Sequence, residues 1–139
     1  MIQTTTWHLR TLNLALAFTS LCVYLEWGKD NSTLLLFAEA EVIKRLFTDP
    51  SSALHPFTII PLLGQLLLLI NTGRRRPGKL LTYIGMACIG ILVLFVAFIG
   101  VLALNIRIVA STLPFLITSV IVLRYYWLRK KQARIKEKG

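Results

Sequence analysis

The chain has 139 residues, of which 55% are hydrophobic and 16% are charged, and its formal net charge is +10. Soluble domains have about 45–50% apolar and about 25% charged residues, so this composition argues against a soluble globular fold. A nucleic-acid-binding domain would carry its cations as a stripe on a folded surface, whereas here they cluster beside long uncharged segments, which excludes nucleic acid as the expected partner and indicates a membrane protein.

Four apolar segments are each about as long as a membrane-spanning helix. A hydrocarbon core about 30 Å thick requires about 20 residues, because each helical residue rises about 1.5 Å. The predicted spans cover residues 9–26, 56–71, 80–104 and 108–128. We therefore predict an all-α integral membrane four-helix bundle formed by residues 1–128, followed by a basic tail, residues 129–139.

Lys and Arg residues gather on one side of these spans. Arg10 precedes most of the first span, four cations lie within residues 74–79, and six lie within residues 129–138. Positively charged flanks of membrane spans remain in the cytoplasm, so both termini are predicted to be cytoplasmic, in what we expect to be a bacterial cytoplasmic membrane. The basic tail is expected to bind anionic lipid headgroups.

Glu26 ends the first predicted span. A carboxyl group in the middle of a membrane span is typical of proton-coupled transport. Because Glu26 lies at the end of its span, where water is available, we interpret it as an interfacial residue and keep a proton relay as the alternative.

The connection that follows contains a predicted amphipathic helix, residues 33–47, which has no Gly or Pro. Four residues before or at its start are good helix caps: Asp30, Asn31, Ser32 and Thr33. Leucine, valine and isoleucine recur on one of its faces, so we expect it to lie in the outer interface or over the mouth of the bundle.

Glu39 falls in the middle of this apolar face. An ionised carboxylate in apolar surroundings is costly unless it is paired. Arg107 is the basic side chain expected at the outer end of the third and fourth spans, so we predict that it pairs with Glu39 or with Glu26. The alternative is that Glu39 reaches water through the headgroup region.

Two polar residues, one just before the second span and one within it, are further candidates. His55 precedes the span and, with Glu26, Asp30 or Glu39, has the chemistry of a metal site, but no metal-binding spacing supports one and we predict no metal. Gln65 lies near the middle of the span, where we expect a hydrogen bond to a neighbouring helix, with a substrate contact as the alternative.

The third span carries small residues on one side, namely Gly90, Ala97 and Gly100. Small residues allow close approach of another helix, which can belong to the same chain, to a second copy or to a partner subunit.

The sequence shows no nucleophile with a base, no phosphate-binding loop and no histidine pair for haem, so we predict a non-enzymatic protein without a cofactor. We expect an accessory or assembly subunit of a larger membrane complex, or a homo-oligomer. One alternative is a small oligomeric transporter or channel that uses Gln65, Glu26, Glu39 and Arg107. The other is an outer-face membrane enzyme that acts on lipid or quinone through Glu26, His55 and Glu39.

Overall fold

The computed structural model describes residues 2–27 and 31–139, and most of these residues are helical. The elements in chain order are α1 (Ile2–Leu21), β1 (Tyr24–Trp27), β2 (Asn31–Leu34), α2 (Leu35–Thr48), α3 (Pro50–Ala53), α4 (Pro56–Gly73), α5 (Lys79–Leu102) and α6 (Ile106–Lys138). Three helices in this part of the chain, α4, α5 and α6, are long and apolar enough to span a membrane. The expectation of a mostly helical protein, with helices long and apolar enough to span a membrane, is thus confirmed.

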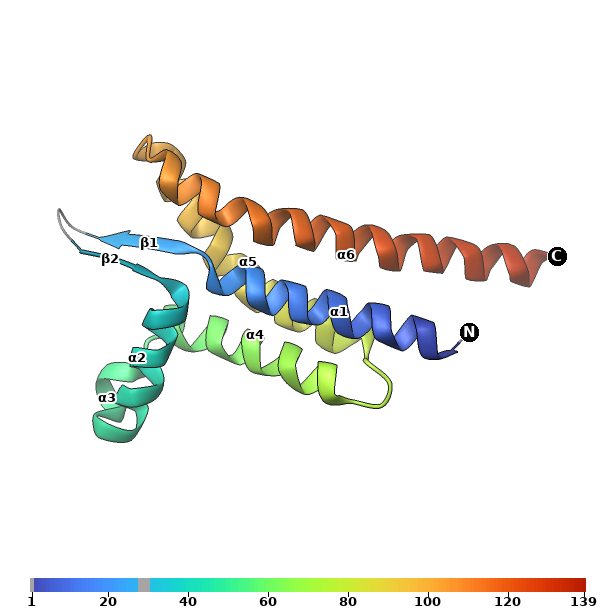
Figure 1. The fold of residues 1–139 in the computed structure, drawn as a ribbon, viewed down its shortest axis with the longest axis horizontal. Coiled ribbons are helices and arrows are strands. Elements are labelled where there is room, and N and C mark those ends of the chain that lie inside the picture. The colour runs from blue at the N-terminus through green and yellow to red at the C-terminus, as the bar shows by residue number, and fades with distance from the viewer. Residues whose placement is uncertain (1, 28–30) are drawn as a thin grey trace.

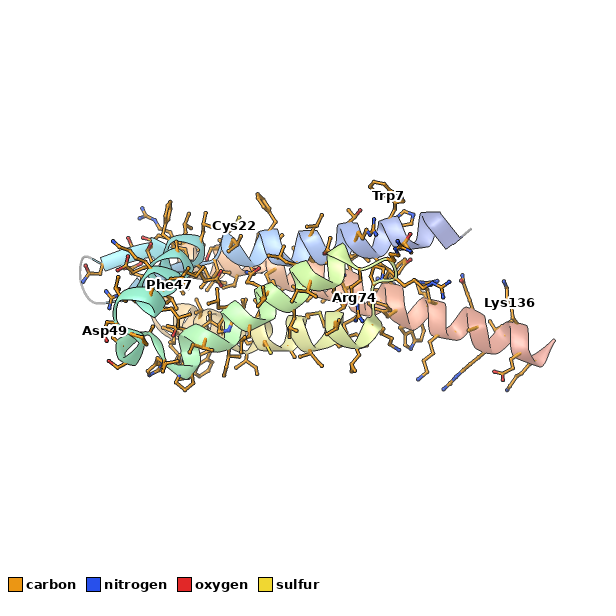
Figure 2. All side chains as sticks on the ribbon, turned by 90° about the horizontal axis from the view of Figure 1, so that it is seen from below. Trp7, Cys22, Phe47, Asp49, Arg74 and Lys136 are labelled. Carbon is orange, nitrogen blue, oxygen red and sulfur yellow. The ribbon has the colours of Figure 1, made fainter. Side chains whose placement is uncertain are left out.

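The long helices α1, α4, α5 and α6 run alongside one another (Figure 1). Contacts are most extensive between α4 and α5, and α1 packs against both α4 and α6. The start of α1, the end of α6 and the connection at residues 74–78 lie at one end of the molecule, which we call the basic end. The strands, α2 and α3 lie at the other, which we call the hairpin end. Figure 2 likewise shows Arg74 and Lys136 far from Phe47 and Asp49.

The first predicted span differs from the structure in its bounds. Helix α1 begins at Ile2 and ends at Leu21, and residues 24–27 form strand β1 instead of helix. Strand β1 pairs with β2 in antiparallel register, with Tyr24 opposite Leu34. Aromatic and β-branched residues favour strands, and a paired hairpin satisfies the backbone groups that end the helix. With 20 residues α1 is about 30 Å long, yet its first turns are polar, and its crossing of the membrane stays a prediction.

Helix α2 begins at Leu35, two residues later than predicted, because the preceding residues pair in β2. Three of the predicted caps, Asn31, Ser32 and Thr33, therefore belong to the strand, and Asp30 lies outside the described residues. Leu34 occupies the N-cap position and supplies no side-chain hydrogen bond. The strand pairing, and not side-chain capping, sets the start of this helix.

Two pairs of helices approach closely at glycine. A Cβ atom added at Gly64 of α4 would lie 2.8 Å from the carbonyl oxygen of Gly85 on α5, so the two backbones touch. A Cβ atom added at Gly100 of α5 would lie 2.8 Å from Ile108 of α6. The residue that a Cβ atom at Gly90 would meet, Phe115, also belongs to α6. Helix α6 thus occupies the side of α5 that carries Gly90 and Gly100.

The α5–α6 connection is short, and its geometry depends on two residues. Leu104 adopts a left-handed backbone conformation with a φ of 50°, which reverses the chain within three residues. Asn105 caps α6, because its side-chain oxygen accepts a hydrogen bond from the backbone N–H of Arg107 at 3.2 Å. Helix α6 then continues without a break through the basic tail to Lys138.

Candidate functional site

A groove lies at the hairpin end, between α2, α4 and the end of α1. It has a volume of about 460 Å³ and is lined by Leu21, Leu36, Glu39, Ala40, Ile43, Leu62, Gln65, Leu66 and Leu69. We call it the Glu39 groove. Ligand sites in proteins have volumes of about 300–1,000 Å³ and apolar walls with a few polar groups, and this groove has the same character.

Glu39 is the charged residue of the groove. Its side chain is 7% exposed, and its Oε1 atom is buried without a hydrogen-bond partner among the described residues. Burial raises the pKa of Glu39 from 4.5 to about 7, because the ionised form loses hydration there. At neutral pH the groove therefore presents a carboxyl group that both accepts hydrogen bonds and exchanges a proton.

The apolar face of α2 remains largely uncovered around Glu39. The buried residues of this helix are Leu35 and Glu39. Leu36 and Ile43, which belong to the predicted apolar face and line the groove, are 46% and 45% exposed. This face is therefore available to lipid or to another apolar surface.

Gln65 lies on α4 at the base of the groove and is 6% exposed. Its side-chain amide donates a hydrogen bond to the hydroxyl of Ser20, which in turn donates to the carbonyl oxygen of Ala17 at 2.7 Å. These bonds join α1 to α4 behind the groove.

The structure does not bring Arg107 to Glu39 or to Glu26. The Glu26 carboxylate accepts a hydrogen bond at 2.8 Å from the side-chain amide of Asn105, and the Arg107 side chain is exposed on the first turn of α6. Asn105 thus has the role that we predicted for Arg107, since it ties β1 to the α5–α6 connection. The sequence signal for Asn105 is its place in the short stretch between the third and fourth apolar segments, where Asn is a typical helix cap.

Within the described residues, one ion pair joins Glu41 to Arg45, with 3.1 Å between the carboxylate oxygen and the guanidinium nitrogen. It lies on the exposed face of α2 and contributes little to stability, because solvent screens it. Glu39, two residues away on the other face, has no such partner.

His55 has a structural role at the start of α4. Its Nδ1 atom accepts a hydrogen bond from the backbone N–H of Phe57 at 3.4 Å, and its ring stacks on the ring of Phe57 with 5.8 Å between centroids. Phe57 in turn stacks on Phe95 of α5. Glu26, His55 and Glu39 have separate surroundings, and no group of three metal-ligating side chains occurs in the described part of the chain.

A second set of buried polar groups lies toward the basic end, with one residue from each long helix: Asn13, Asn71, Thr82 and Tyr126. The Thr82 hydroxyl donates to Asn13 Oδ1 at 2.8 Å and accepts from Asn71 Nδ2 at 2.9 Å. It also lies 3.3 Å from the Tyr126 hydroxyl. We call these four residues the polar layer. Tyr126 adjoins the basic tail in the sequence, and no local pattern there reveals its buried contact.

An apolar layer separates the two polar sites. On α1, the fully buried Leu16 lies between Asn13 of the polar layer and Ser20, the partner of Gln65. On α4, the fully buried Leu68 occupies the corresponding place. Along the described residues of α1 and α4, buried leucines therefore interrupt the row of polar side chains.

The Glu39 groove can accept a donor that reaches it from an apolar surface, because its walls are apolar and its one carboxyl oxygen is free. The other polar side chain in the lining of the groove is Gln65, whose amide nitrogen donates to Ser20. Comparison of this chain with protein-family models, with curated proteins and with solved structures gives no match.

Proposed function

We propose that the protein is a non-enzymatic integral membrane protein that crosses the bilayer four times, and that it serves as an accessory or assembly subunit of a larger membrane complex. The partner binds at the Glu39 groove. A single observation carries this proposal: a buried carboxyl oxygen without a partner in an otherwise apolar, open groove.

The four-span topology is supported by the placement of the cations and of α1. Helix α1 packs along α4 and α6, two of the three helices that meet the length and composition of a membrane span. The basic connection at residues 74–78 and the basic end of α6 lie at the same end of the molecule (Figure 1). Both termini are cytoplasmic in this proposal, in a bacterial cytoplasmic membrane, because positive flanks remain inside.

The chemistry of the groove indicates the kind of partner. An isolated carboxylate in apolar surroundings is costly, and a donor such as a Lys, Arg or amide side chain on a membrane helix relieves that cost. Leu66 and Leu69 on α4, each 52% exposed, form an apolar wall that such a helix covers. The groove therefore suits a transmembrane segment with one donor at the depth of Glu39.

Photo-crosslinking in native membranes tests this proposal. A photoreactive residue is placed at Ala40 inside the groove, and at Leu94, which is exposed on α5 outside the groove. We expect the Ala40 probe, and not the Leu94 probe, to capture one membrane protein. That product should disappear in Glu39→Leu and persist in Glu41→Leu, which alters the exposed face of the same helix.

Three results would overturn the proposal. Products that contain lipid alone at Ala40 would assign the groove to the bilayer. A product of twice the chain's mass would replace the partner with a second copy. Capture of the same protein from Leu94 would show that proximity, and not the groove, selects it.

The two alternative functions have less support. A transporter that uses Gln65, Glu26, Glu39 and Arg107 needs a polar route, whereas the fully buried Leu16 and Leu68 separate Gln65 and Ser20 from the polar layer along α1 and α4. A membrane enzyme acting on lipid or quinone needs Glu26, His55 and Glu39 to converge. Their hydrogen bonds and ring contacts involve different neighbours.

A further inference from the structure

A second cavity lies toward the basic end, between the start of α5 and residues 123–130 of α6. It has a volume of about 440 Å³. It is lined by three cations, Lys79, Arg124 and Lys130, and by three aromatic side chains, Tyr83, Tyr126 and Trp127. We call it the basic pocket.

The cations of the basic pocket have no acidic neighbour in its lining. Five of the six acidic residues of the chain precede residue 50, and the sixth, Glu137, lies in the last turn of α6. Lys79 is instead held by an aromatic ring, since its ammonium group lies 5.5 Å from the centroid of Tyr83. The pocket thus combines uncompensated positive charge with aromatic walls, which favours an anion.

The order of residues along α6 indicates what kind of anion fits. Leu123 and Arg124 come first, Tyr126 and Trp127 follow, and Lys130 lies furthest toward the basic end. Leu123, Trp127 and Lys130 are separated by three, four or seven positions, so they share one face of the helix, which changes from apolar to aromatic to cationic within two turns, with Arg124 beside Leu123. An acyl chain, a glycerol backbone and a phosphate are arranged in the same order in a phospholipid.

We propose that the basic pocket binds one anionic phospholipid of the cytoplasmic leaflet, with its phosphate between Lys79, Arg124 and Lys130. Basic pockets between membrane helices on the cytoplasmic side have this chemistry. Inorganic phosphate would use the cations but not the apolar wall at Leu123, so the lipid is the better occupant. The assignment to the cytoplasmic leaflet rests on the proposed topology. Lipid binding itself does not depend on the partner proposed for the Glu39 groove.

Native mass spectrometry of the full chain in mild detergent tests this inference. The protein is titrated with phosphatidylglycerol or phosphatidylcholine, and the retained lipid is counted. We expect one phosphatidylglycerol to be retained in preference to phosphatidylcholine. The triple variant Lys79→Gln/Arg124→Gln/Lys130→Gln should weaken this retention at least tenfold.

The matched control also removes three positive charges, but from the tail outside the pocket: Arg134→Gln/Lys136→Gln/Lys138→Gln. It should change lipid retention less than twofold. Equal weakening by both triple variants would show diffuse attraction and overturn the site, as would equal retention of phosphatidylcholine. Displacement of the lipid by millimolar inorganic phosphate would assign the pocket to free phosphate.

The single variant Lys130→Gln changes an exposed residue and provides a second test. It should weaken retention about threefold while circular dichroism and thermal unfolding stay unchanged. Unchanged retention in this variant and in a folded triple variant would contradict the inference. Since the measurement is made in detergent without a partner, its failure would leave the crosslinking result at Ala40 untouched.

Discussion

Glu39 is the residue whose chemistry depends most on its surroundings. Its pKa in the folded protein is about 7, against an ordinary value of 4.5, because burial disfavours the ionised form. The folded state therefore binds the proton more tightly than the unfolded state does. The contribution of Glu39 protonation to the free energy of unfolding is fully present below about pH 4.5 and is lost as the pH rises through about 7.

We predict that the free energy of unfolding falls by up to about 3 kcal/mol between pH 5 and pH 8 because of this group alone. Thermal unfolding of the wild type and of Glu39→Gln in mild detergent measures it. The variant should lose most of the pH dependence, because an amide does not titrate in this range. Glu41→Gln, on the exposed face of α2, is the control and should behave like the wild type. Equal pH dependence in Glu39→Gln and the wild type would contradict the assignment.

The sequence was sufficient to single out Glu39 as a carboxyl group on an apolar helix face, because helical periodicity places it there. It was not sufficient to identify its neighbours. The predicted partner, Arg107, is exposed at the start of α6, and Asn105 lies beside Glu26 instead. Such contacts depend on how the β1–β2 hairpin orients α2, which no local pattern in the chain reveals.

At the scale of elements, the most extensive helix contact is that between α4 and α5, where the two backbones touch. The Cβ atom of an alanine at Gly64 would lie 2.8 Å from a backbone oxygen of Gly85, which cannot move without shifting the helix. We predict that Gly64→Ala destabilises the protein by about 1–3 kcal/mol through overpacking.

Thermal unfolding against Gly73→Ala measures this effect, since an added Cβ atom at Gly73 would meet no heavy atom within 4 Å. The control should change stability by less than about 0.5 kcal/mol. Equal destabilisation by both substitutions would contradict the prediction, because an added Cβ atom crowds no neighbour at Gly73 and helix propensity favours Ala over Gly.

Element boundaries were predictable where long uncharged runs define them. Helices α4 and α5 begin and end within two residues of the predicted spans, and α6 begins two residues before its own. Helix α6 extends ten residues beyond the predicted end, because its tail is rich in Lys, Arg and Gln, which are good helix formers. The strands were missed, because residues 24–27 are apolar enough to read as the end of a helix.

At the scale of the whole molecule, the two polar sites lie at opposite ends. The polar layer joins all four long helices toward the basic end, and the Glu39 groove remains open at the hairpin end. The packing of α1 against α4 and α6 is consistent with four membrane crossings, although the first turns of α1 are polar. The crossing of α1 is thus the central claim on which the orientation of both sites depends.

Labelling of single cysteines in intact cells tests this claim most directly. Cys22 and Cys88 are first replaced by Ala, and one cysteine is then introduced in each of four variants: Gln3→Cys, Ser51→Cys, Arg75→Cys or Gly139→Cys. We predict that a membrane-impermeant maleimide labels Ser51→Cys in intact cells, and labels the other three after the membrane is opened. Labelling of Gln3→Cys together with Ser51→Cys from outside would show that α1 does not cross, and labelling of Ser51→Cys and Arg75→Cys from the same side would contradict the four-span account.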